Sequence, residues 1–283
     1  MWNQIKTVLL LGILTGILLA VGSLFGKTGL TFAIIFVVLM NAVTYFFSDK
    51  IALAMYRAKP IKKNELPWLH KIIKEITTKA KIPEPLGIYL IPTEQANAFC
   101  AGRGPSHYVV AVTSGILKIL DKEELRGVLA HEISHAKNRD VLVATVAATI
   151  AGIIGYLSQM LQFGAMFGGV GNDNDRGAGN ILGLLVLAIL TPIIAIIIQL
   201  AISRSREYMA DESGAKLIHD GKPLASALEK INASVKNTPM RFGAEAASSL
   251  FIANPFSGKA FVNLFSTHPP FEERVRKLKE MQF

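Results

Sequence analysis

The sequence predicts an integral membrane protein that is mainly α-helical and contains a small β-sheet. The first observation is composition: 51% of the 283 residues are hydrophobic and the mean hydropathy is +0.39, which is too apolar for an ordinary soluble domain. The second is the presence of four long segments without a charged residue. The third is a polar remainder that includes short strand-like runs bounded by proline and glycine.

The four uncharged segments each approach the roughly 20 residues that a helix needs to cross a bilayer. Residues 7–25 and 28–48 predict a helical hairpin, and a cleaved signal peptide is the alternative for the first of them. Residues 141–162 and 180–203 predict a second hairpin, in which Pro192 should kink the fourth span. Helices buried in a soluble core are also apolar all round, so this second pair has an alternative reading.

Loop charges orient the spans, because lysine and arginine concentrate in cytoplasmic loops. Basic residues follow the second and fourth spans, at Lys50, Arg57, Lys59, Lys62, Lys63, Arg204 and Arg206. The two hairpin loops carry only Lys27 and Arg176. Both termini are therefore predicted to be cytoplasmic. The chain divides into a hairpin, a first domain part, a second hairpin and a second domain part, over residues 1–48, 49–140, 141–203 and 204–283.

The net charge of +9 does not indicate a nucleic-acid-binding protein. The basic residues are scattered between apolar spans and form no stripe interleaved with stacking aromatic residues. The single cysteine, Cys100, excludes an intramolecular disulfide framework and fits a reducing compartment. We therefore expect the polar domain on the cytoplasmic side and no nucleic-acid partner.

A helix with a metal-binding pattern is predicted over residues 121–140. Asp121 and Glu124 have capping-box spacing at its start, and apolar residues follow at helical spacing. The segment HEISH lies within this helix, from His131 to His135. Residues four apart on a helix share a face, so both imidazoles can bind one metal ion. The alternative is that two surface histidines flank a glutamate by chance.

The residue after His131 completes a hydrolytic pattern. Glu132 can reach a water molecule on a metal that the two histidines bind. Zinc held by neutral imidazoles lowers the pKa of its water toward about 7, and a neighbouring carboxylate can accept the proton. The pattern therefore predicts zinc-dependent hydrolysis of a peptide bond, with Glu132 as the general base.

A catalytic zinc site also needs a third protein ligand and one position open to water. Glu207 is the candidate, in a segment that should continue the fourth span as a helix. Asp211 lies four residues later on the same face and can accept a hydrogen bond from the outer nitrogen of a zinc-bound histidine. The alternative is that both acids pair with Arg204 and Arg206 on a solvated helix.

Taken in this order, the motifs resemble the HtpX-type heat-shock membrane proteases, relatives of the CAAX prenyl proteases and the mitochondrial Oma-type proteases. The resemblance covers nearly the whole chain. It rests on the paired N-terminal spans, the HEISH segment, the Glu207 and Asp211 pair, and the terminal Ser266-Thr267-His268-Pro269-Pro270. One departure is Ser134, which stands where many relatives have glycine and which we expect on the solvent side of the helix.

The resemblance implies a zincin-like metalloprotease domain of the gluzincin type, with one zinc ion per chain. It assigns His131, His135 and Glu207 as zinc ligands and Glu132 as the base. It also assigns His268 as a donor to the oxyanion of the tetrahedral intermediate. A capping or structural role is the alternative for His268, because two prolines and a predicted helix follow it.

Short strands are predicted before the metal helix, over residues 86–91, 97–100 and 107–113. In proteases that the chain resembles, a strand edge beside the metal helix binds the substrate as an added strand. Asn97, Ala98 and Phe99 match the family's segment at this place. The alternative is an ordinary hairpin with Phe99 in the core.

Together these patterns predict a zinc endopeptidase of a bacterial-type inner membrane, with its active site in the cytoplasm and within about 10 Å of the bilayer surface. The resemblance implies that it cleaves cytoplasmic segments of misfolded or damaged membrane proteins, in protein quality control and the stress response. Its expected partners are polypeptide substrates and the lipid bilayer. One alternative is a processing protease for a defined, possibly lipid-modified substrate. Another is a zinc transporter or sensor, which would place ionisable residues within the spans.

Overall fold

The computed structural model describes residues 26–140, 178–237 and 269–283, together with scattered residues of 9–17 and 142–159. Most of the predicted first span, half of the predicted third span and His268 lie outside the described residues. The chain divides into two compact units. One comprises Met1–Val43 and Ala144–Ile202, and the other comprises Thr44–Val143 and Ser203–Phe283.

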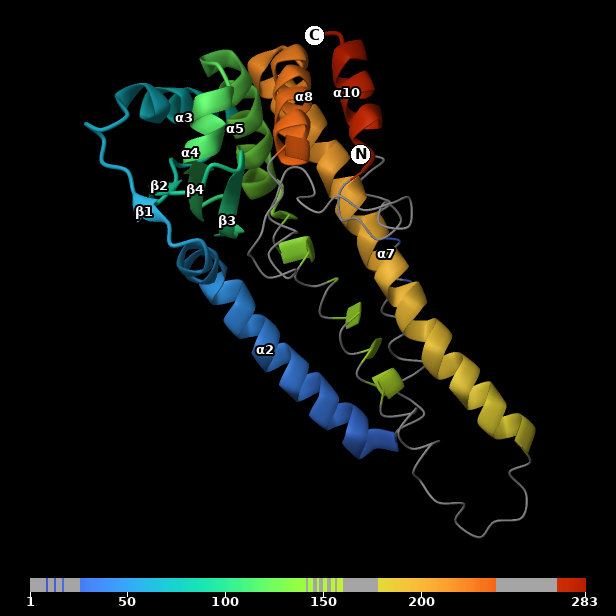
Figure 1. Cartoon of the computed structure of the whole chain (residues 1–283). Coiled ribbons are helices and arrows are strands. Elements are labelled where there is room, and N and C mark those ends of the chain that lie inside the picture. Colours follow the sequence, from blue (N-terminus) through green and yellow to red (C-terminus); the bar gives the residue numbers. More distant parts are fainter. Residues whose placement is uncertain are drawn as a thin grey trace. The chain divides into compact units, whose positions relative to one another are not determined.

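Two long helices belong in part to the first unit, α2 (Gly26–Met55) and α7 (Ala178–Ile218), the latter continuous through Pro192 (Figure 1). Large apolar side chains are exposed along them, at Ile34, Ile35, Leu39, Val43, Val186, Ile189, Leu190, Ile193, Ile194, Ile196 and Ile197. Among the described residues, one helical segment, Ile189–Ile218, is long and apolar enough to cross a membrane. This segment overlaps the fourth of the four predicted spans, residues 180–203.

The second unit contains a four-stranded mixed sheet in the order β1-β2-β4-β3 (Figure 1). Its strands are β1 (Lys59–Pro60), β2 (Ile88–Ile91), β3 (Ala98–Gly104) and β4 (His107–Thr113). Strands β2 and β4 are parallel, whereas β4 pairs antiparallel with β3. The predicted strands are thus confirmed, with shifted ends, and β3 forms one edge of the sheet.

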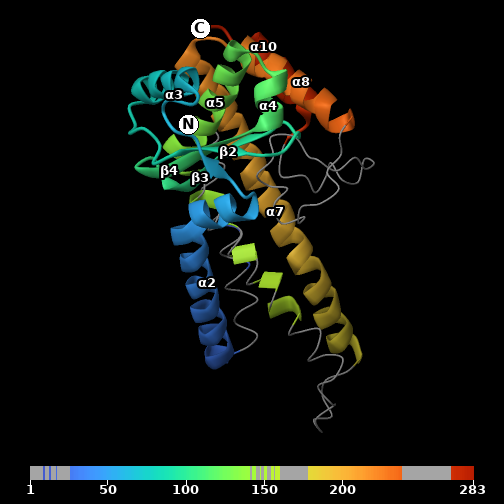
Figure 2. The same cartoon turned by 60° about the vertical axis from the view of Figure 1, so that its left-hand side comes forward.

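The two faces of the sheet pack against different partners because successive side chains on a strand point to opposite faces. Along β4, Val110 and Val112 lie in the main core with residues of α3 (Pro67–Ala80) and α5 (Lys122–Lys137). Val109 and Ala111 lie in a smaller cluster with Ala52, near the end of α2. Both views show α3, α4 (Ser114–Ile119) and α5 on one side of the sheet (Figures 1 and 2).

Helix α5 begins at the predicted capping box. The backbone N–H of Glu124 donates to Asp121 Oδ1 at 2.9 Å, and the backbone N–H of Asp121 donates to Glu124 Oε2 at 3.0 Å. Glu124 also joins α5 to α8 (Lys222–Asn237), because it accepts hydrogen bonds from Ser226 and Lys230, each 2.7 Å long. The start of the metal-motif helix is therefore fixed both locally and by a neighbouring helix.

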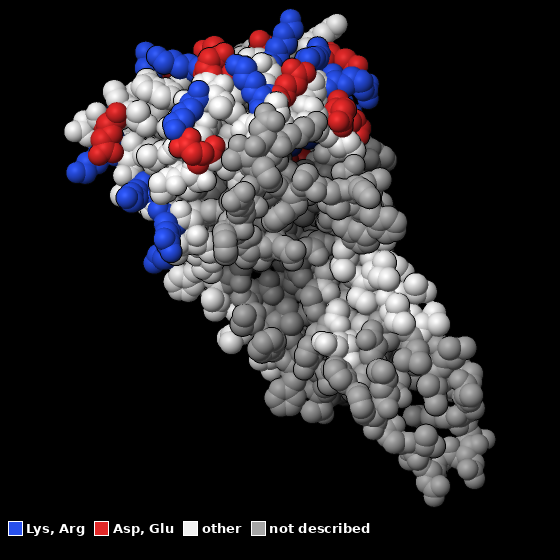
Figure 3. Space-filling model, in the orientation of Figure 1, with Lys and Arg blue, Asp and Glu red and all other residues white. Residues whose placement is uncertain are grey.

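The last described helix is α10 (Phe271–Glu280), which packs beside α8. Its first turn is acidic and its last turn basic, which suits the helix dipole. On the face shown in Figure 3, basic and acidic side chains are interspersed over the second unit. Such a mixed surface agrees with the absence of a basic stripe from the sequence.

Candidate metal centre

Helix α5 places the HEISH segment inside the second unit rather than on its surface. His131 is 1% exposed and Glu132 6% exposed. Ser134 is fully buried, and its hydroxyl donates to the carbonyl of Ala130 at 2.7 Å. The expectation that Ser134 faces solvent was wrong, because α5 is covered on several sides by β3, α3 and α8. Its hydroxyl is satisfied within the helix, as is common for buried serine.

Helix α7 brings Glu207 and Asp211 to the same place. It approaches α5 closely at Gly214, where a Cβ atom would lie 2.8 Å from the backbone nitrogen of His131. Any larger residue would therefore push the two helices apart at the metal motif. Because Asp211 precedes Gly214 by one helical turn, this contact sets the position of the acidic residues against His131.

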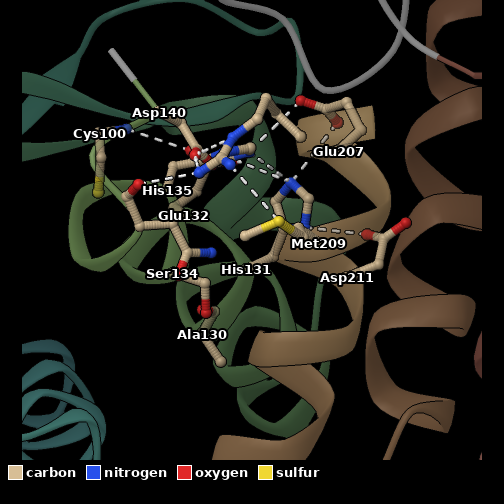
Figure 4. Close-up of polar contacts among 12 residues, drawn as sticks. Cys100, Ala130, His131, Glu132, Ser134, His135, Asp140, Glu207, Met209 and Asp211 are labelled. Carbon is tan, nitrogen blue, oxygen red and sulfur yellow. Dashed lines mark hydrogen bonds and ion pairs between the residues drawn. The ribbon is translucent and has the colours of Figure 1, made fainter. Parts of the chain in front are cut away.

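Three potential ligand atoms converge between the two helices (Figure 4). The Nε2 atoms of His131 and His135 are 3.1 Å apart. Glu207 Oε1 lies 3.4 Å from Nε2 of His135, and Glu207 Oε2 lies 3.7 Å from Nε2 of His131. Donors at about 2.1 Å from a tetrahedral ion are about 3.4 Å from one another. The three side chains therefore fit a single tetrahedral metal ion.

Each histidine is held from behind by an aspartate. Asp211 Oδ1 lies 2.9 Å from Nδ1 of His131, and Asp140 Oδ2 lies 2.7 Å from Nδ1 of His135. A carboxylate at Nδ1 fixes the ring orientation and directs Nε2 toward the metal. The contact of Asp211 was predicted from the sequence. Asp140 was missed, although it stands only five residues after His135.

Each aspartate is in turn held by an arginine. Arg206 donates to Asp140, and also to the carbonyl of Asn138 at 2.8 Å. Arg274 of α10 donates to both oxygens of Asp211, at 2.8 and 2.7 Å. Glu207 and Asp211 are therefore not on a solvated helix, and Arg206 binds Asp140 rather than either of them. No local sequence pattern indicates these pairs, since 66 and 63 residues separate their partners.

The electrostatic environment favours a cation at the cluster. Burial lowers the pKa of His135, but the carboxylates of Asp140 and Glu207 outweigh it and raise that pKa well above the usual value. Burial raises the pKa of Asp211, but Arg274 and His131 reverse the effect and lower it to about 2. Asp211 is thus a carboxylate at every pH near neutrality.

Glu132 lies beside the cluster and is held by the sheet edge. Its Oε2 accepts a hydrogen bond of 3.2 Å from the backbone N–H of Cys100 on β3, and its Oε1 is 4.0 Å from Nε2 of His131. Burial raises the pKa of Glu132, and the nearby histidines offset part of that rise. A carboxyl group with a raised pKa in this position is suited to accept a proton.

The three residues predicted to bind substrate lie at the start of β3. Phe99 is buried in the smaller core cluster, with its ring 5.4 Å from that of Tyr56. Asn97 is also buried and bonds to Thr113 on the side of β4. Main-chain groups alternate in direction along a strand, so those of Ala98 and Cys100 face the outer edge. The donation from Cys100 to Glu132 agrees with that direction.

A comparison with known protein families shows which family the chain belongs to. Residues 63–282 match the model described as Peptidase family M48. The chain belongs to peptidase family M48. It is 48% identical to a Protease HtpX homolog of Syntrophobacter fumaroxidans, over 99% of this chain and all of that protein. It is 52% identical to a Protease HtpX homolog of Persephonella marina, over 99% of this chain and 97% of that protein.

These M48 relatives confirm the resemblance to HtpX-type proteases, and the chain is a metallopeptidase. Among solved structures, Ste24p of S. mikatae matches with a TM-score of 0.59 and 20% sequence identity. The match covers 98% of this chain, which spans 65% of the length of that protein. At this identity the likeness shows the M48 fold alone.

Proposed function

We propose that this M48 peptidase is a membrane-embedded zinc endopeptidase that cleaves cytoplasmic segments of misfolded or damaged membrane proteins. The convergence of His131, His135 and Glu207 beside Glu132 carries the proposal. Two imidazoles and one carboxylate form a donor set that suits catalytic zinc and leaves a coordination position open. Bound zinc supplies Lewis-acid chemistry, since it polarises a carbonyl and lowers the pKa of water.

Glu132 acts as the general base in this proposal. The Cys100 N–H holds Oε2 and leaves Oε1 directed toward the ligand cluster. Water that attacks the scissile carbonyl transfers a proton to this carboxylate, which can then deliver it to the leaving amine. The raised pKa of Glu132 favours both steps, because a carboxylate whose pKa is closer to neutral pH can both accept and release the proton.

The outer edge of β3 binds the substrate as an additional strand. Main-chain hydrogen bonds at Ala98 would position the peptide without selecting its sequence, while Asn97 and Phe99 support the strand from within. Such binding fits a protease that acts on many damaged proteins. His268 is proposed to stabilise the oxyanion on the strength of the sequence resemblance alone, since it lies outside the described residues.

Helix α7 supports a site at the membrane surface. The apolar stretch and Glu207 belong to one continuous helix, and Glu207 lies four residues beyond the predicted end of the fourth span, or about 6 Å along the axis. The exposed apolar side chains of α2 and α7 would face lipid in this arrangement. We propose a multi-pass protein of a bacterial-type inner membrane with both termini in the cytoplasm.

The proposal is tested with Glu132→Gln in detergent-purified full-length protein. We expect cleavage of casein and of a membrane protein with an exposed cytoplasmic loop to fall at least about 1,000-fold. Zinc content should stay at one ion per chain, because Glu132 is not a ligand in this assignment. Undiminished cleavage by the variant would contradict the proposed mechanism, and zinc loss would contradict the ligand assignment.

The alternative is a processing protease for one defined substrate, possibly lipid-modified. The resemblance of the sequence motifs to those of the CAAX prenyl proteases is the observation in its favour. The two functions differ in breadth of substrate. Cleavage of several unrelated membrane proteins at exposed loops would support quality control, whereas cleavage of a single lipid-modified peptide would support processing.

A further inference from the structure

Arg274 is a buried charge that the proposed mechanism does not use. It lies in α10, and its side chain is 2% exposed. Its guanidinium makes two hydrogen bonds to Asp211 and a third contact to Glu207, where Nη1 and Oε2 are 3.3 Å apart. Arginine can hold two carboxylates in this way because its donors form a rigid planar fork.

Both carboxylates that Arg274 contacts lead to the metal site. Asp211 contacts Nδ1 of His131, and Glu207 is itself in the ligand cluster. The positive charge of Arg274 lies beside Glu207 Oε2 and attracts it, while Oε1 of the same carboxylate faces His135. One side chain from α10 thus contacts one proposed ligand, Glu207, and the aspartate that holds a second proposed ligand, His131.

We propose that Arg274 is a positioning residue of the metal centre, through which helix α10 sets the affinity of the site for zinc. The inference rests on the proposed zinc site. It predicts that zinc binding depends on a residue that is not itself a ligand. Along the sequence, Arg274 is more than 60 residues from both Glu207 and Asp211.

Two physical effects of Arg274 on zinc affinity have opposite signs. Its positive charge repels a divalent cation, so its removal could strengthen binding. Its removal also leaves the buried charge of Asp211 without its main partner, so that the carboxylates lose their fixed orientation. The second effect should dominate, because two hydrogen bonds to Asp211 already compensate the guanidinium charge. Loss of such outer partners weakens metal binding about 10- to 100-fold.

The docking of α10 does not depend on Arg274 alone. Val275 and Leu278 of this helix pack into the main core, and Lys279 contacts Glu229 of α8 at 2.7 Å. Figure 1 shows α10 beside α8. Variants of α10 can therefore separate the effect of the arginine from the effect of loosening the helix.

The test measures the dissociation constant for Zn²⁺ in full-length protein in detergent, by competition with a chelating dye after the metal has been removed. We expect Arg274→Gln to raise the constant about 10- to 100-fold. Arg274→Lys keeps the charge without the fork and should fall between this variant and wild type. Arg276→Gln is the matched control, because Arg276 is exposed on the same helix and pairs with Glu280. It should bind zinc as wild type does.

Leu278→Ala is the second control, because it removes a buried side chain of α10 without touching the ligand cluster. It should lower the thermal midpoint but leave zinc affinity within about twofold of wild type. Tighter or unchanged binding by Arg274→Gln would overturn the inference, as would an equal loss in Leu278→Ala. If Arg274→Gln does not fold, wild-type affinity in Arg274→Lys overturns it instead. Failure of wild-type protein to bind zinc would reject the proposed function itself.

Discussion

His131 and His135 have matching environments on the side away from the ligand cluster. An aspartate contacts Nδ1 of each ring, and an arginine contacts each aspartate. The aspartates come from different parts of the chain, one directly after α5 and the other within α7. Because a carboxylate contacts Nδ1 of both rings, neither Nε2 can turn away from the cluster without breaking a buried contact to an aspartate.

Asp140→Asn tests the residue that the sequence did not reveal. We expect zinc affinity to fall about 10- to 100-fold, because the amide removes the charge that holds both His135 and Arg206. Zinc titration of the purified protein measures the change. Asp220→Asn is the control, since Asp220 is exposed and its side chain accepts a hydrogen bond from the nearby backbone N–H of Lys222, which an asparagine oxygen can also accept. Equal affinities in the two variants would contradict this role of Asp140.

Cys100 contributes its backbone rather than its thiol. The contact to Glu132 uses the N–H of Cys100, which any non-proline residue retains. We therefore expect Cys100→Ala to cleave casein within about twofold of wild type, with a stability loss of about 1 kcal/mol for the smaller buried side chain. Proteolysis and thermal unfolding assays check this outcome. A loss of activity as large as that of Glu132→Gln would show that the sulfur itself takes part.

At the scale of elements, the position of the metal helix depends on its neighbours. Glu124 both caps α5 and joins it to α8, through Ser226 and Lys230. Gly127 permits a close approach, because a Cβ atom there would lie 2.7 Å from the backbone nitrogen of Leu224. The start of α5 is thus anchored to α8, while its HEISH turn is anchored to α7 at Gly214.

The contacts of Glu124 with Ser226 and Lys230 should make the stability of the fold depend on pH, and Glu124→Gln tests this. Burial raises the pKa of Glu124, but hydrogen bonds from Lys230, Ser226 and the Asp121 backbone outweigh it and lower that pKa below 4.5. The ionised form therefore stabilises the fold above the unfolded-state pKa, and this stability is lost as the pH falls through the lower folded-state pKa. At neutral pH the variant should be less stable by about 1 to 3 kcal/mol.

Unfolding experiments on wild type and Glu124→Gln between pH 7 and pH 3 measure the difference in their unfolding free energies. This difference should shrink below about pH 4. Glu123→Gln is a matched control on the same turn, because Glu123 is largely exposed and pairs only with Arg126 among the described contacts. A difference that stays constant across the range would mean that ionisation of Glu124 does not stabilise the joint.

At the scale of the whole molecule, polar and apolar surfaces belong to different parts of the chain. Charged side chains are interspersed over the face of the second unit that Figure 3 shows. Exposed apolar residues instead line α2 and the N-terminal part of α7. Long helices with this many large exposed apolar side chains are unusual in a monomeric soluble protein. The division supports the proposed membrane location, and the loop charges supply its proposed orientation.

The single cysteine makes this orientation testable. In a Cys100→Ala background, a cysteine at Glu280 should be protected from a membrane-impermeant maleimide in intact cells, because the proposed topology places α10 in the cytoplasm. A cysteine at Asp173, in the loop between the third and fourth predicted spans, should be labelled. Permeabilised cells provide the control in which both sites react. Labelling of both or neither in intact cells would contradict the four-span topology.

Local patterns in the sequence predicted the elements that carry the site. Helical spacing placed His131 and His135 on one face, and the capping box marked the start of α5. The continuous α7 was predicted from the segment that contains Glu207 and Asp211. These predictions depend on contacts between residues three to four apart, whose geometry is a property of the helix itself. Strand ends and the burial of Ser134 were predicted less well, since they depend on what packs against each element.

The sequence by itself therefore determined which side chains are candidates for the proposed chemistry and which helices present them. Only the tertiary structure decided how those side chains are held. Arg274 reaches Asp211 across 63 residues and Arg206 reaches Asp140 across 66, so no local periodicity relates the partners. Likewise, Gly214 matters because another helix approaches it. Such contacts follow from how the core packs α5, α7 and α10 together, which a pattern along one segment cannot specify.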